Sequence, residues 1–518
     1  MHLVLLHGYL LQGTGSNIYV ANVAKAWKNQ GHAVTVICQD RQANLLQFVN
    51  EYIGLEDNLP TFSPKAGTIR VVVPNINNLL PVYVYDRYDG YQVKTIPEMT
   101  HKEIENHIEL TASSLRNVAL QGVDRVLANH AIFGPVIAKK ALENLDVPFD
   151  VKIHGSAVEY TLVPNPNLMK YAFEGLAGAK NIFVGTQYVK NRVMEVFSDE
   201  SKYLRLENKL RIVPPGIDPD IFTLSNDPAA TQRRFFNEVR KEIQKNGNGR
   251  NRNSMTTQID ILDEDLHETL IKLGETYDQR AIDADLVEKW LLLKEDEPII
   301  IYFGKFLGVK GVGEILVTVP AILSLIPEVR FIFVGFGSYR EHFEGMIQAL
   351  GNGDQDAFIA YARAGDFVKK IDFSKWFRRL SQEEIGRITV TGILDHKTLS
   401  ELLPLASLAI VPSKWPEAFG MVAVEAMAAG VLPLCNYHAG LLDVVDEVEV
   451  ASTELAEIMR MDLDKFVDQL PDKVQNALFF LYPHGFEIQS ARRKVGEQLR
   501  RIAVEKFSWD DIAKRLLQ

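Results

Sequence analysis

The chain has 518 residues, and its 56 lysines and arginines against 67 aspartates and glutamates give a formal net charge of −11. At about 100–200 residues per domain, this length predicts roughly two to four domains. The acidic balance argues against a protein that coats nucleic acid, which needs a strongly basic surface. Two cysteines, Cys38 and Cys435, are too few for a disulfide framework or a zinc cluster, so a reducing, cytoplasmic compartment fits best.

The sequence predicts neither a targeting signal nor a membrane span. The apolar start stops at His7 without a basic n-region, and no run approaches about 18 apolar residues. Residues 369–380 mix basic and aromatic positions, so this segment could lie on the inner face of an anionic membrane. A solvated helix face with a buried apolar stripe explains the same pattern, and we favour it because such patterns are weak membrane signals.

The first half alternates strand-like and helical segments. A buried run at 3–6, a glycine-bearing loop and an amphipathic helix from about 17 to 29 lead to a strand at 34–38. Such a unit implies a parallel sheet. Further strands are expected at 69–73, 125–128, 151–153, 181–184 and 210–213.

The alternation restarts at Pro298, after an interruption at Pro214-Pro215-Gly216. Strands are expected at 299–303, 329–334, 388–391, 408–411 and 431–434, with helices at 314–325, 397–403 and 422–429. The fold class is therefore predicted to be α/β, with two doubly wound, Rossmann-like domains facing a central cleft.

The expected domain boundaries follow from this pattern. The first domain covers 1–215, together with a C-terminal helix of about 500–518, and the second covers 298–499. Residues 216–297 are expected to form a linker and a helical insertion. Its middle, 245–258, lacks apolar periodicity and predicts a flexible surface loop.

The loop after the first strand is a candidate anion site. Gly13, Gly15 and Ser16 precede the first helix, where free N–H groups and the helix dipole favour a phosphate. The dinucleotide fingerprint GxGxxG is broken at Ile18, so a dinucleotide cofactor bound by Asp40 is a minor alternative. A plain structural turn is another alternative.

Three histidines each follow a predicted strand of the first half. They are His7, His130 and His154, and ligands of open α/β sheets bind beyond such strand ends. Three at one edge favour a polar cleft, although core or capping roles are common for single histidines. Their spacing does not suit a metal, so neutral imidazoles could bind a sugar hydroxyl or move a proton.

The strongest pattern is EAFGMVAVE, which runs from Glu417 to Glu425. Gly420 argues that Glu417 lies in a loop and that a helix begins near Met421. The amides near Phe419, Gly420 and Met421 would then suit a phosphate. Glu425 could accept hydrogen bonds from a diol such as ribose.

Two lysines follow the first strand of the second half. Lys305 and Lys310 lie in GKFLGVKG, and paired cations at a strand end suit a diphosphate. Surface lysines are usually only solvated, so this pair alone does not distinguish the two interpretations.

In combination, these segments resemble the retaining glycosyltransferases of family 4, which have the GT-B fold and transfer a sugar from a nucleotide donor. The segments that carry the resemblance are E-x7-E at 417–425 with AMAAG after it, GKFLGVKG with Lys305 in place of the usual arginine, V-G-x-G at 334–337, T-G at 391–393, P-x-G-I-D at 214–218 and F-S-W at 507–509. Four stretches remain unexplained: 41–100, 223–297, 345–387 and 446–490.

The resemblance implies a role for each candidate in the second half. Lys305 and Lys310 would neutralise the departing diphosphate. The Gly420 and Met421 amides would hold the distal phosphate. Glu425 would bind the ribose, Glu417 would contact the transferred sugar, and the backbone at Ile393 would hold the nucleotide base.

The resemblance also implies roles in the first half. Residues 13–16 would approach the diphosphate, and His130 and His154 match the family's histidines near the reacting sugar. The donor would be UDP-, GDP- or ADP-linked, with no other cofactor and no metal, and the anomeric configuration would be retained. The acceptor, a carbohydrate, a lipid or a small molecule, is not identified.

A tyrosine-rich segment at 79–94 is a candidate acceptor site or, equally, an exposed strand face. Its residues of interest are Tyr83, Tyr85, Asp86, Arg87, Tyr88, Asp89 and Tyr91.

Two other functions stay open. One is a nucleotide-sugar epimerase or hydrolase on the same scaffold. The other is a non-catalytic module that binds a sugar nucleotide and serves assembly. The sequence does not indicate an oligomeric state.

Overall fold

The computed structural model describes residues 1–13, 15–54, 63–83, 88, 90–245, 249–251, 259–262, 264–290, 297–365 and 372–518. The chain divides into two compact units, Met1–Gly216 with Phe507–Gln518, and Ile217–Lys506. The segment expected as a linker and insertion therefore belongs to the second unit. The chain returns to the first unit at Phe507, at the end of one continuous helix.

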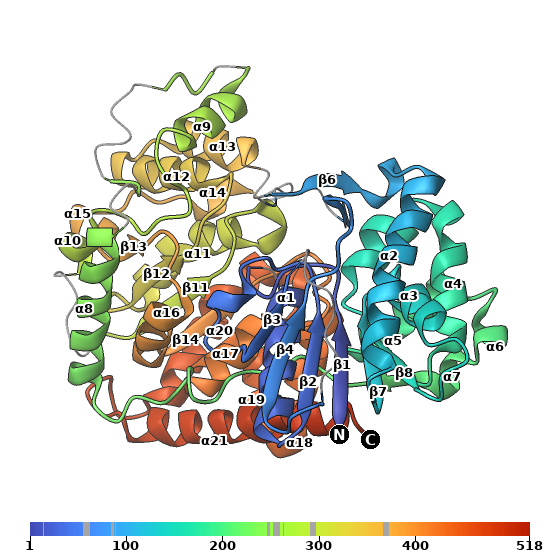
Figure 1. Ribbon diagram of the computed structural model, residues 1–518. Helices are drawn as coiled ribbons and strands as arrows, with labels where there is room; N and C mark the ends of the chain where they lie inside the picture. The colour runs from blue at the N-terminus through green and yellow to red at the C-terminus, as the bar shows by residue number, and fades with distance from the viewer. Residues whose placement is uncertain are drawn as a thin grey trace. The chain divides into compact units, whose positions relative to one another are not determined.

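The first unit is built on a parallel sheet (Figure 1). Among the described residues the sheet has eight strands, and every residue of the central strands is buried. Strands covered on both faces are uniformly apolar, which is why these runs are visible in the sequence. From edge to edge the order is β10 (Leu210–Ile212), β9 (Ile182–Val184), β8 (Phe149–Lys152), β7 (Arg125–Asn129), β1 (His2–Leu6), β2 (Ala33–Ile37), β4 (Thr68–Val72) and β3 (Glu51–Ile53).

The C-terminal helix α22 (Trp509–Arg515) packs on α1 (Gly15–Asn29) within the first unit. The indole N–H of Trp27 donates to the carbonyl of Ala513 at 3.0 Å. Gly216 is required here, because a Cβ would lie 2.6 Å from the Trp509 ring. The expected return of a C-terminal helix to the first unit is confirmed for α22, whereas residues 500–506, also expected there, end α21 in the second unit. The other helices of this unit are α2 (His101–Ala119), α3 (Gly134–Ala141), α4 (Met169–Gly178), α5 (Gln187–Val196), α6 (Ser201–Leu204) and α7 (Leu206–Lys209).

Three strands of the first unit are not among the strands expected with bounds from the sequence, although a strand is an alternative for the segment 79–94. They are β3 and a separate parallel pair, β5 (Leu79–Val82) with β6 (Gln92–Thr95). None of the residues in β6 is buried, so this strand shows no apolar alternation. Tyr85, Asp86, Arg87 and Asp89 of the tyrosine-rich segment lie outside the described residues, as does Thr14 of the glycine loop.

The second unit repeats the architecture with its own parallel sheet (Figure 1). Its described residues form six strands, and the five expected ones are present with ends within two residues of the predicted ends. Their order is β13 (Ile388–Val390), β12 (Arg330–Val334), β11 (Ile299–Phe303), β14 (Leu408–Val411), β15 (Leu432–Asn436) and β16 (Arg460–Met461). The predicted α/β fold with two Rossmann-like domains is confirmed.

Helices connect and cover this second sheet. The expected helices are α11 (Val312–Leu325), α16 (His396–Leu402) and α17 (Met421–Ala428). Helix α17 begins at Met421, directly after Gly420, as predicted. The others are α8 (Pro228–Lys245), α9 (Leu266–Gly274), α10 (Leu286–Trp290), α12 (Arg340–Asn352), α13 (Gln355–Ala364), α14 (Phe373–Trp376), α15 (Gln382–Ile385), α18 (Ala439–Ala451), α19 (Thr453–Met459), α20 (Phe466–Leu481) and α21 (Ser490–Phe507).

The insertion corrects one expectation. Residues 246–248 and 252–258 lie outside the described residues, but Gly249 and Arg250 between them are buried. The Arg250 guanidinium donates to both carboxylate oxygens of Glu341, at 2.7 and 3.1 Å. The prediction of a surface loop is therefore wrong at these two residues. An ion pair with a partner 91 residues away leaves no periodic signal in the local sequence.

The basic-aromatic segment forms only a short helix in its described part. Residues 369–371 are not described, and α14 ends at Trp376, before the remaining arginines. Arg378 pairs with Glu384 and Arg379 donates to the Gly351 carbonyl. Phe373 and Leu380 are buried. The basic-aromatic spacing implies one continuous helix, but residues 372–380 do not form one. The described side chains of this segment instead make contacts within the second unit.

Candidate functional site

At the strand ends of the first unit, His7, His130 and His154 come together. His7 follows β1, His130 follows β7, and His154 lies two residues beyond β8. The rings of His7 and His130 stack with centroids 5.8 Å apart, and those of His130 and His154 are 4.8 Å apart. Tyr83 places its ring 4.6 Å from that of His130, while Tyr9 packs against both rings. The structure thus groups the three predicted histidines with two tyrosines.

Burial makes this cluster electrically neutral. It lowers the pKa of His7 to about 4 and holds the pKa values of His130 and His154 well below the usual range for histidine. Asn17 accepts a hydrogen bond from His7 Nε2 at 2.9 Å, and Asn129 accepts one from His154 Nε2 at 2.9 Å. The amide groups of these asparagines donate to backbone carbonyls, so their oxygens face the imidazoles. These contacts select the Nε2–H tautomers of His7 and His154.

His130 differs from its two neighbours. Its side chain is buried, yet neither ring nitrogen has a hydrogen-bond partner among the described residues. Its φ is +70°, a conformation that residues other than glycine rarely adopt. The backbone N–H of His130 donates to the Lys152 carbonyl at 2.7 Å, which holds the residue there. A neutral imidazole with a free donor and a free acceptor is suited to an uncharged hydroxyl group.

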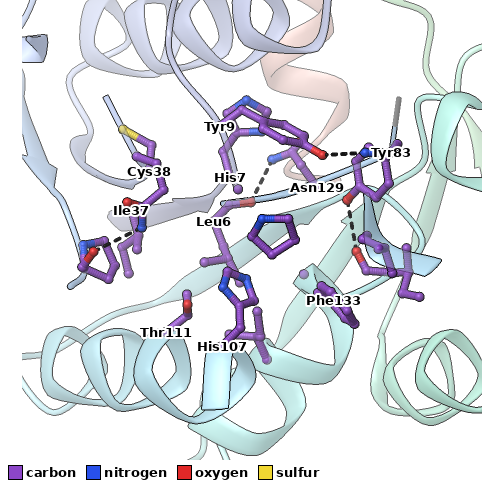
Figure 2. Close-up of a pocket in the computed structure, with 18 residues that line it drawn as sticks. Leu6, His7, Tyr9, Ile37, Cys38, Tyr83, His107, Thr111, Asn129 and Phe133 are labelled. Atoms are coloured by element: carbon purple, nitrogen blue, oxygen red, sulfur yellow. Dashed lines mark hydrogen bonds between the residues drawn. The ribbon is translucent and has the colours of Figure 1, made fainter. Parts of the chain in front are cut away.

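His7, Tyr9 and Tyr83 of this cluster line a small cavity (Figure 2). Its volume is about 30 Å³, enough for one or two water molecules but not for a sugar. His107 and Thr111, one turn apart on α2, line it together with His7, and His107 Nδ1 and Thr111 Oγ1 have no partner among the described residues. The sequence analysis missed both residues, because one histidine and one threonine on an amphipathic helix give no distinct signal.

The glycine loop is open at its two glycines. A Cβ at Gly13 or Gly15 would meet nothing within 4 Å, and Ser16 lies in the first turn of α1. Asp40, the alternative ribose ligand, accepts from the backbone N–H groups of Leu11 at 3.1 Å and Gln42 at 3.0 Å. Its carboxylate is therefore occupied in shaping the loop. The dinucleotide interpretation is not supported at this residue.

The second unit presents a charged site at its own strand ends. Lys310 forms an ion pair with Glu417, and Ser413 Oγ donates to the same carboxylate oxygen at 2.7 Å. Both charged side chains are about 30% exposed, at 30% and 28%. Lys305 is exposed and has no ion-pair partner within the described ranges. One lysine is thus already paired, and the other is free to meet an anion.

The start of α17 supplies unpaired backbone donors. The amides of Gly420 and Met421 have no hydrogen-bond partner among the described residues, as expected at a helix N-terminus. Phe419, just before them, is buried. Glu425 lies one turn into the helix, and burial raises its pKa to about 8, so its carboxyl group is largely protonated near pH 7. A protonated carboxyl group can both donate to and accept from a diol.

Ile393 follows β13, where the resemblance places the base. Its backbone N–H donates to the Ala281 carbonyl at 3.3 Å, so this donor is already used. The structure therefore leaves Ile393 beside the insertion and groups Lys310 with Glu417.

No group of three histidine, cysteine, aspartate or glutamate side chains able to hold a metal occurs in the part of the chain that the structure describes.

Two family models match the chain. The model described as Glycosyltransferase Family 4 matches residues 13–221, and the model described as Glycosyl transferases group 1 matches residues 365–457. Sucrose-phosphate synthase from Thermosynechococcus elongatus aligns over 100% of this chain and 97% of its own, with a TM-score of 0.56 and 16% identity. HepE from Anabaena, solved in complex with UDP, aligns over 100% and 98%, with a TM-score of 0.53 and 12% identity.

The fold is GT-B. Together with the two model matches, this fold supports the interpretation of the chain as a GT-B glycosyltransferase of the family 4 type. A lipopolysaccharide 1,2-N-acetylglucosaminetransferase of Salmonella typhimurium is 24% identical over 242 residues, which are 47% of this chain and 52% of that protein. An α-D-kanosaminyltransferase of Streptomyces kanamyceticus is 25% identical over 29% of this chain and 30% of its own. The chain thus matches about half or less of the length of these relatives.

These names are those of transferases, so the epimerase and hydrolase alternative is not favoured. Among the helices in the described ranges, none is both long enough and apolar enough to cross a membrane.

Proposed function

We propose that this GT-B protein transfers a sugar from a nucleotide-linked donor to a hydroxyl-bearing acceptor, with retention of configuration and without a metal. The observation that carries the proposal is the charged edge of the second unit. There Lys305, the Lys310–Glu417 pair and the free amides at the start of α17 lie beyond the ends of β11 and β14. Cations and helix N-terminal amides can replace a metal in neutralising a leaving diphosphate.

In the proposed reaction, the bond between the anomeric carbon and the diphosphate oxygen breaks, and the acceptor oxygen bonds to the same carbon on the same face. The proton of the acceptor hydroxyl passes to the departing phosphate oxygen, so no protein base is required. Lys305 and Lys310 stabilise the charge that develops on the diphosphate. The role proposed for Glu417 is to contact the sugar, and that for His130 is to bind an uncharged hydroxyl.

The donor is proposed to be UDP-, GDP- or ADP-linked. The UDP complex of HepE, a protein of similar fold, supports testing uridine first. The acceptor is proposed to be a carbohydrate, a lipid or a small molecule, and the polar, uncharged first-unit cluster supports an acceptor or sugar with neutral hydroxyls.

A thermal-shift screen with nucleoside diphosphates and nucleotide sugars, with a chelator present, tests this function. A ligand that binds only the folded state raises the melting temperature by mass action. We expect nucleotides with one base to raise the melting temperature, and the nucleotide sugar with one particular sugar to raise it further. Product NMR with candidate acceptors would then establish the anomeric configuration. A well-folded sample that responds to no nucleotide would contradict the proposal.

A further inference from the structure

The loop that carries Glu417 is held by the turn between β15 and α18. The Asn436 side-chain amide is buried and donates to the carbonyls of Pro412 at 2.8 Å and Ser413 at 3.3 Å. A carbonyl only accepts hydrogen bonds, so His438 Nε2 carries a hydrogen and donates it to the same Ser413 carbonyl at 2.7 Å. The turn therefore fixes the start of the Glu417 loop.

Two further contacts fix the end of this loop and its carboxylate. The Gly440 N–H donates to the Glu417 carbonyl at 2.9 Å. A Cβ at Gly440 would lie 2.6 Å from that carbonyl oxygen, so only glycine allows the turn to pack this closely. Ser413 Oγ, on the backbone that His438 holds, donates to Glu417 Oε1 at 2.7 Å. The main chain of Glu417 is thus positioned directly from the turn, and its side chain is positioned through Ser413.

The turn keeps a backbone conformation that its sequence does not favour. Ala439, the first residue of α18, has a φ of +47°, in a region that residues with a Cβ rarely adopt. His438 before it and Gly440 after it make the contacts with the Glu417 loop. Strained residues persist where the surrounding contacts over-determine them, and they gather at functional sites. The strain at Ala439 therefore supports a turn whose contacts serve a site.

We propose that His438 is a positioning residue of the sugar site, which sets the place of Glu417 without touching the substrate. This inference rests on the proposed function, in which Glu417 contacts the transferred sugar. The imidazole N–H holds the Ser413 carbonyl, and the Ser413 hydroxyl holds the Glu417 carboxylate. The diphosphate contacts proposed for Lys305 and for the amides of α17 do not pass through His438. Loss of His438 should therefore affect the sugar and spare the diphosphate.

The test is calorimetric titration of the full chain and its His438→Ala variant. The probes are UDP, GDP and ADP, each alone and joined to glucose, mannose or N-acetylglucosamine. The wild type is expected to bind one nucleotide sugar more tightly than the corresponding diphosphate. In His438→Ala this gain from the sugar should fall about 10-fold, the effect of losing one hydrogen bond to a charged group. Affinity for the diphosphate alone should not fall.

Two other variants separate positioning from a general loss of structure. His438→Gln keeps an N–H donor at a similar reach and should retain most of the gain from the sugar. His484→Ala is the matched control, because His484 is exposed and lies two residues after Tyr482. The Tyr482 hydroxyl bonds with Ser407 Oγ at 2.7 Å, at the opposite end of β14 from the Glu417 loop. The gain in His484→Ala should be that of the wild type.

A double-mutant cycle shows whether His438 acts through Glu417. Glu417→Ala should lose the gain from the sugar, and adding His438→Ala in that background should have no further effect on the ratio of the two affinities. Losses that multiply would mean that His438 contributes independently of Glu417, and they would overturn the inference.

The outcomes separate the inference from the function on which it rests. An unchanged gain in a folded His438→Ala variant overturns the inference and leaves the transferase proposal standing. A wild type that binds a diphosphate but gains nothing from any attached sugar also overturns it, since Glu417 then contacts no sugar. A well-folded wild type that binds no nucleotide overturns both. If His438→Ala fails to fold, Ser413→Ala, which removes only the hydroxyl donor to Glu417, should show the same loss.

Discussion

The two units share one architecture but place opposite kinds of side chain at their strand ends. In the first unit the edge carries buried, neutral imidazoles and phenols, among them His130 without a hydrogen-bond partner in the described chain. In the second unit the edge carries Lys305, Lys310 and Glu417, partly exposed and next to free backbone amides. The parallel β/α scaffold brings candidate site residues together beyond the strand ends in both cases, and the residues just after each strand differ in chemistry.

This contrast indicates which part of the substrates each unit is proposed to bind. A diphosphate needs cations and N–H donors, whereas sugar hydroxyls need neutral donors and acceptors that do not compete for charge. If the assignment is right, substitutions at the charged edge and at the neutral edge should fail in different ways. Variants at each edge test that expectation.

The largest effect is expected for Glu417→Ala. Removing a group that is proposed to contact the transferred sugar should lower turnover by about 10³-fold. Affinity for the nucleoside diphosphate should be equal or higher, because Lys310 loses its partner and becomes free for phosphate. Product formation and titration of the diphosphate measure the two quantities separately.

Glu401→Ala is the matched control, since Glu401 is also in the second unit, is 24% exposed and pairs with Arg234. Its turnover should be that of the wild type. Normal turnover in Glu417→Ala would show that the sugar site lies elsewhere.

His130→Asn should produce the next largest loss. Asparagine tolerates the left-handed backbone at this residue better than alanine does, so the substitution tests the imidazole and not the strain. Losing hydrogen bonds to a sugar hydroxyl should lower kcat/KM by about 10- to 100-fold. Diphosphate affinity should stay constant, which is the opposite of the pattern expected for a lysine variant.

His101→Asn, at an exposed histidine of the same unit, controls for the general effect of the exchange. A His130→Asn variant with normal kcat/KM would reduce the first-unit cluster to a structural role.

Lys310→Ala should weaken diphosphate binding by about 10-fold, since it removes a charge-assisted contact and leaves Glu417 unpaired beside the anion. The measurement is calorimetric titration at constant salt, because screening changes such contacts. Lys94→Ala is the control, because Lys94 is 29% exposed and pairs with Glu103. Equal affinities for wild type and Lys310→Ala would remove this lysine from the phosphate site.

Much of the scaffold could be predicted because its signals are local. Strands such as β11 and β14 are buried on both faces and give continuous apolar runs, so their bounds match the predicted ones. The start of α17 follows from Gly420, whose residue type marks the break. For the same reason, the positions of the candidate residues at strand ends could be predicted.

What could not be predicted depends on distant partners. The pairing of Lys310 with Glu417 spans 107 residues, and that of Arg250 with Glu341 spans 91. Neither is encoded by a local period, so Arg250 was assigned to a surface loop. Asp40 was likewise a plausible ribose ligand until its contacts with the Leu11 and Gln42 amides were known.

The smallest effect is expected for Glu425→Gln, and it appears in stability. Burial raises the pKa of this carboxyl group to about 8, against about 4.3 in an unfolded chain. The folded state therefore favours the protonated form, so its stabilising effect is complete below about pH 4.3 and is lost as pH rises towards 8. Glutamine resembles the protonated acid and does not titrate. Without nucleotide, the variant should melt roughly a few degrees above the wild type near pH 8.5, and this difference should vanish towards pH 4.5.

Calorimetry of both proteins across that range measures the difference. A constant difference at all pH values would mean that the Glu425 carboxyl group is hydrated and titrates normally. The second-unit edge would then be charged throughout, and its contrast with the neutral first-unit edge would be sharper. A difference that grows with pH instead shows that the charged edge contains a neutral hydrogen-bonding group, placed one turn into α17 beside the proposed phosphate amides.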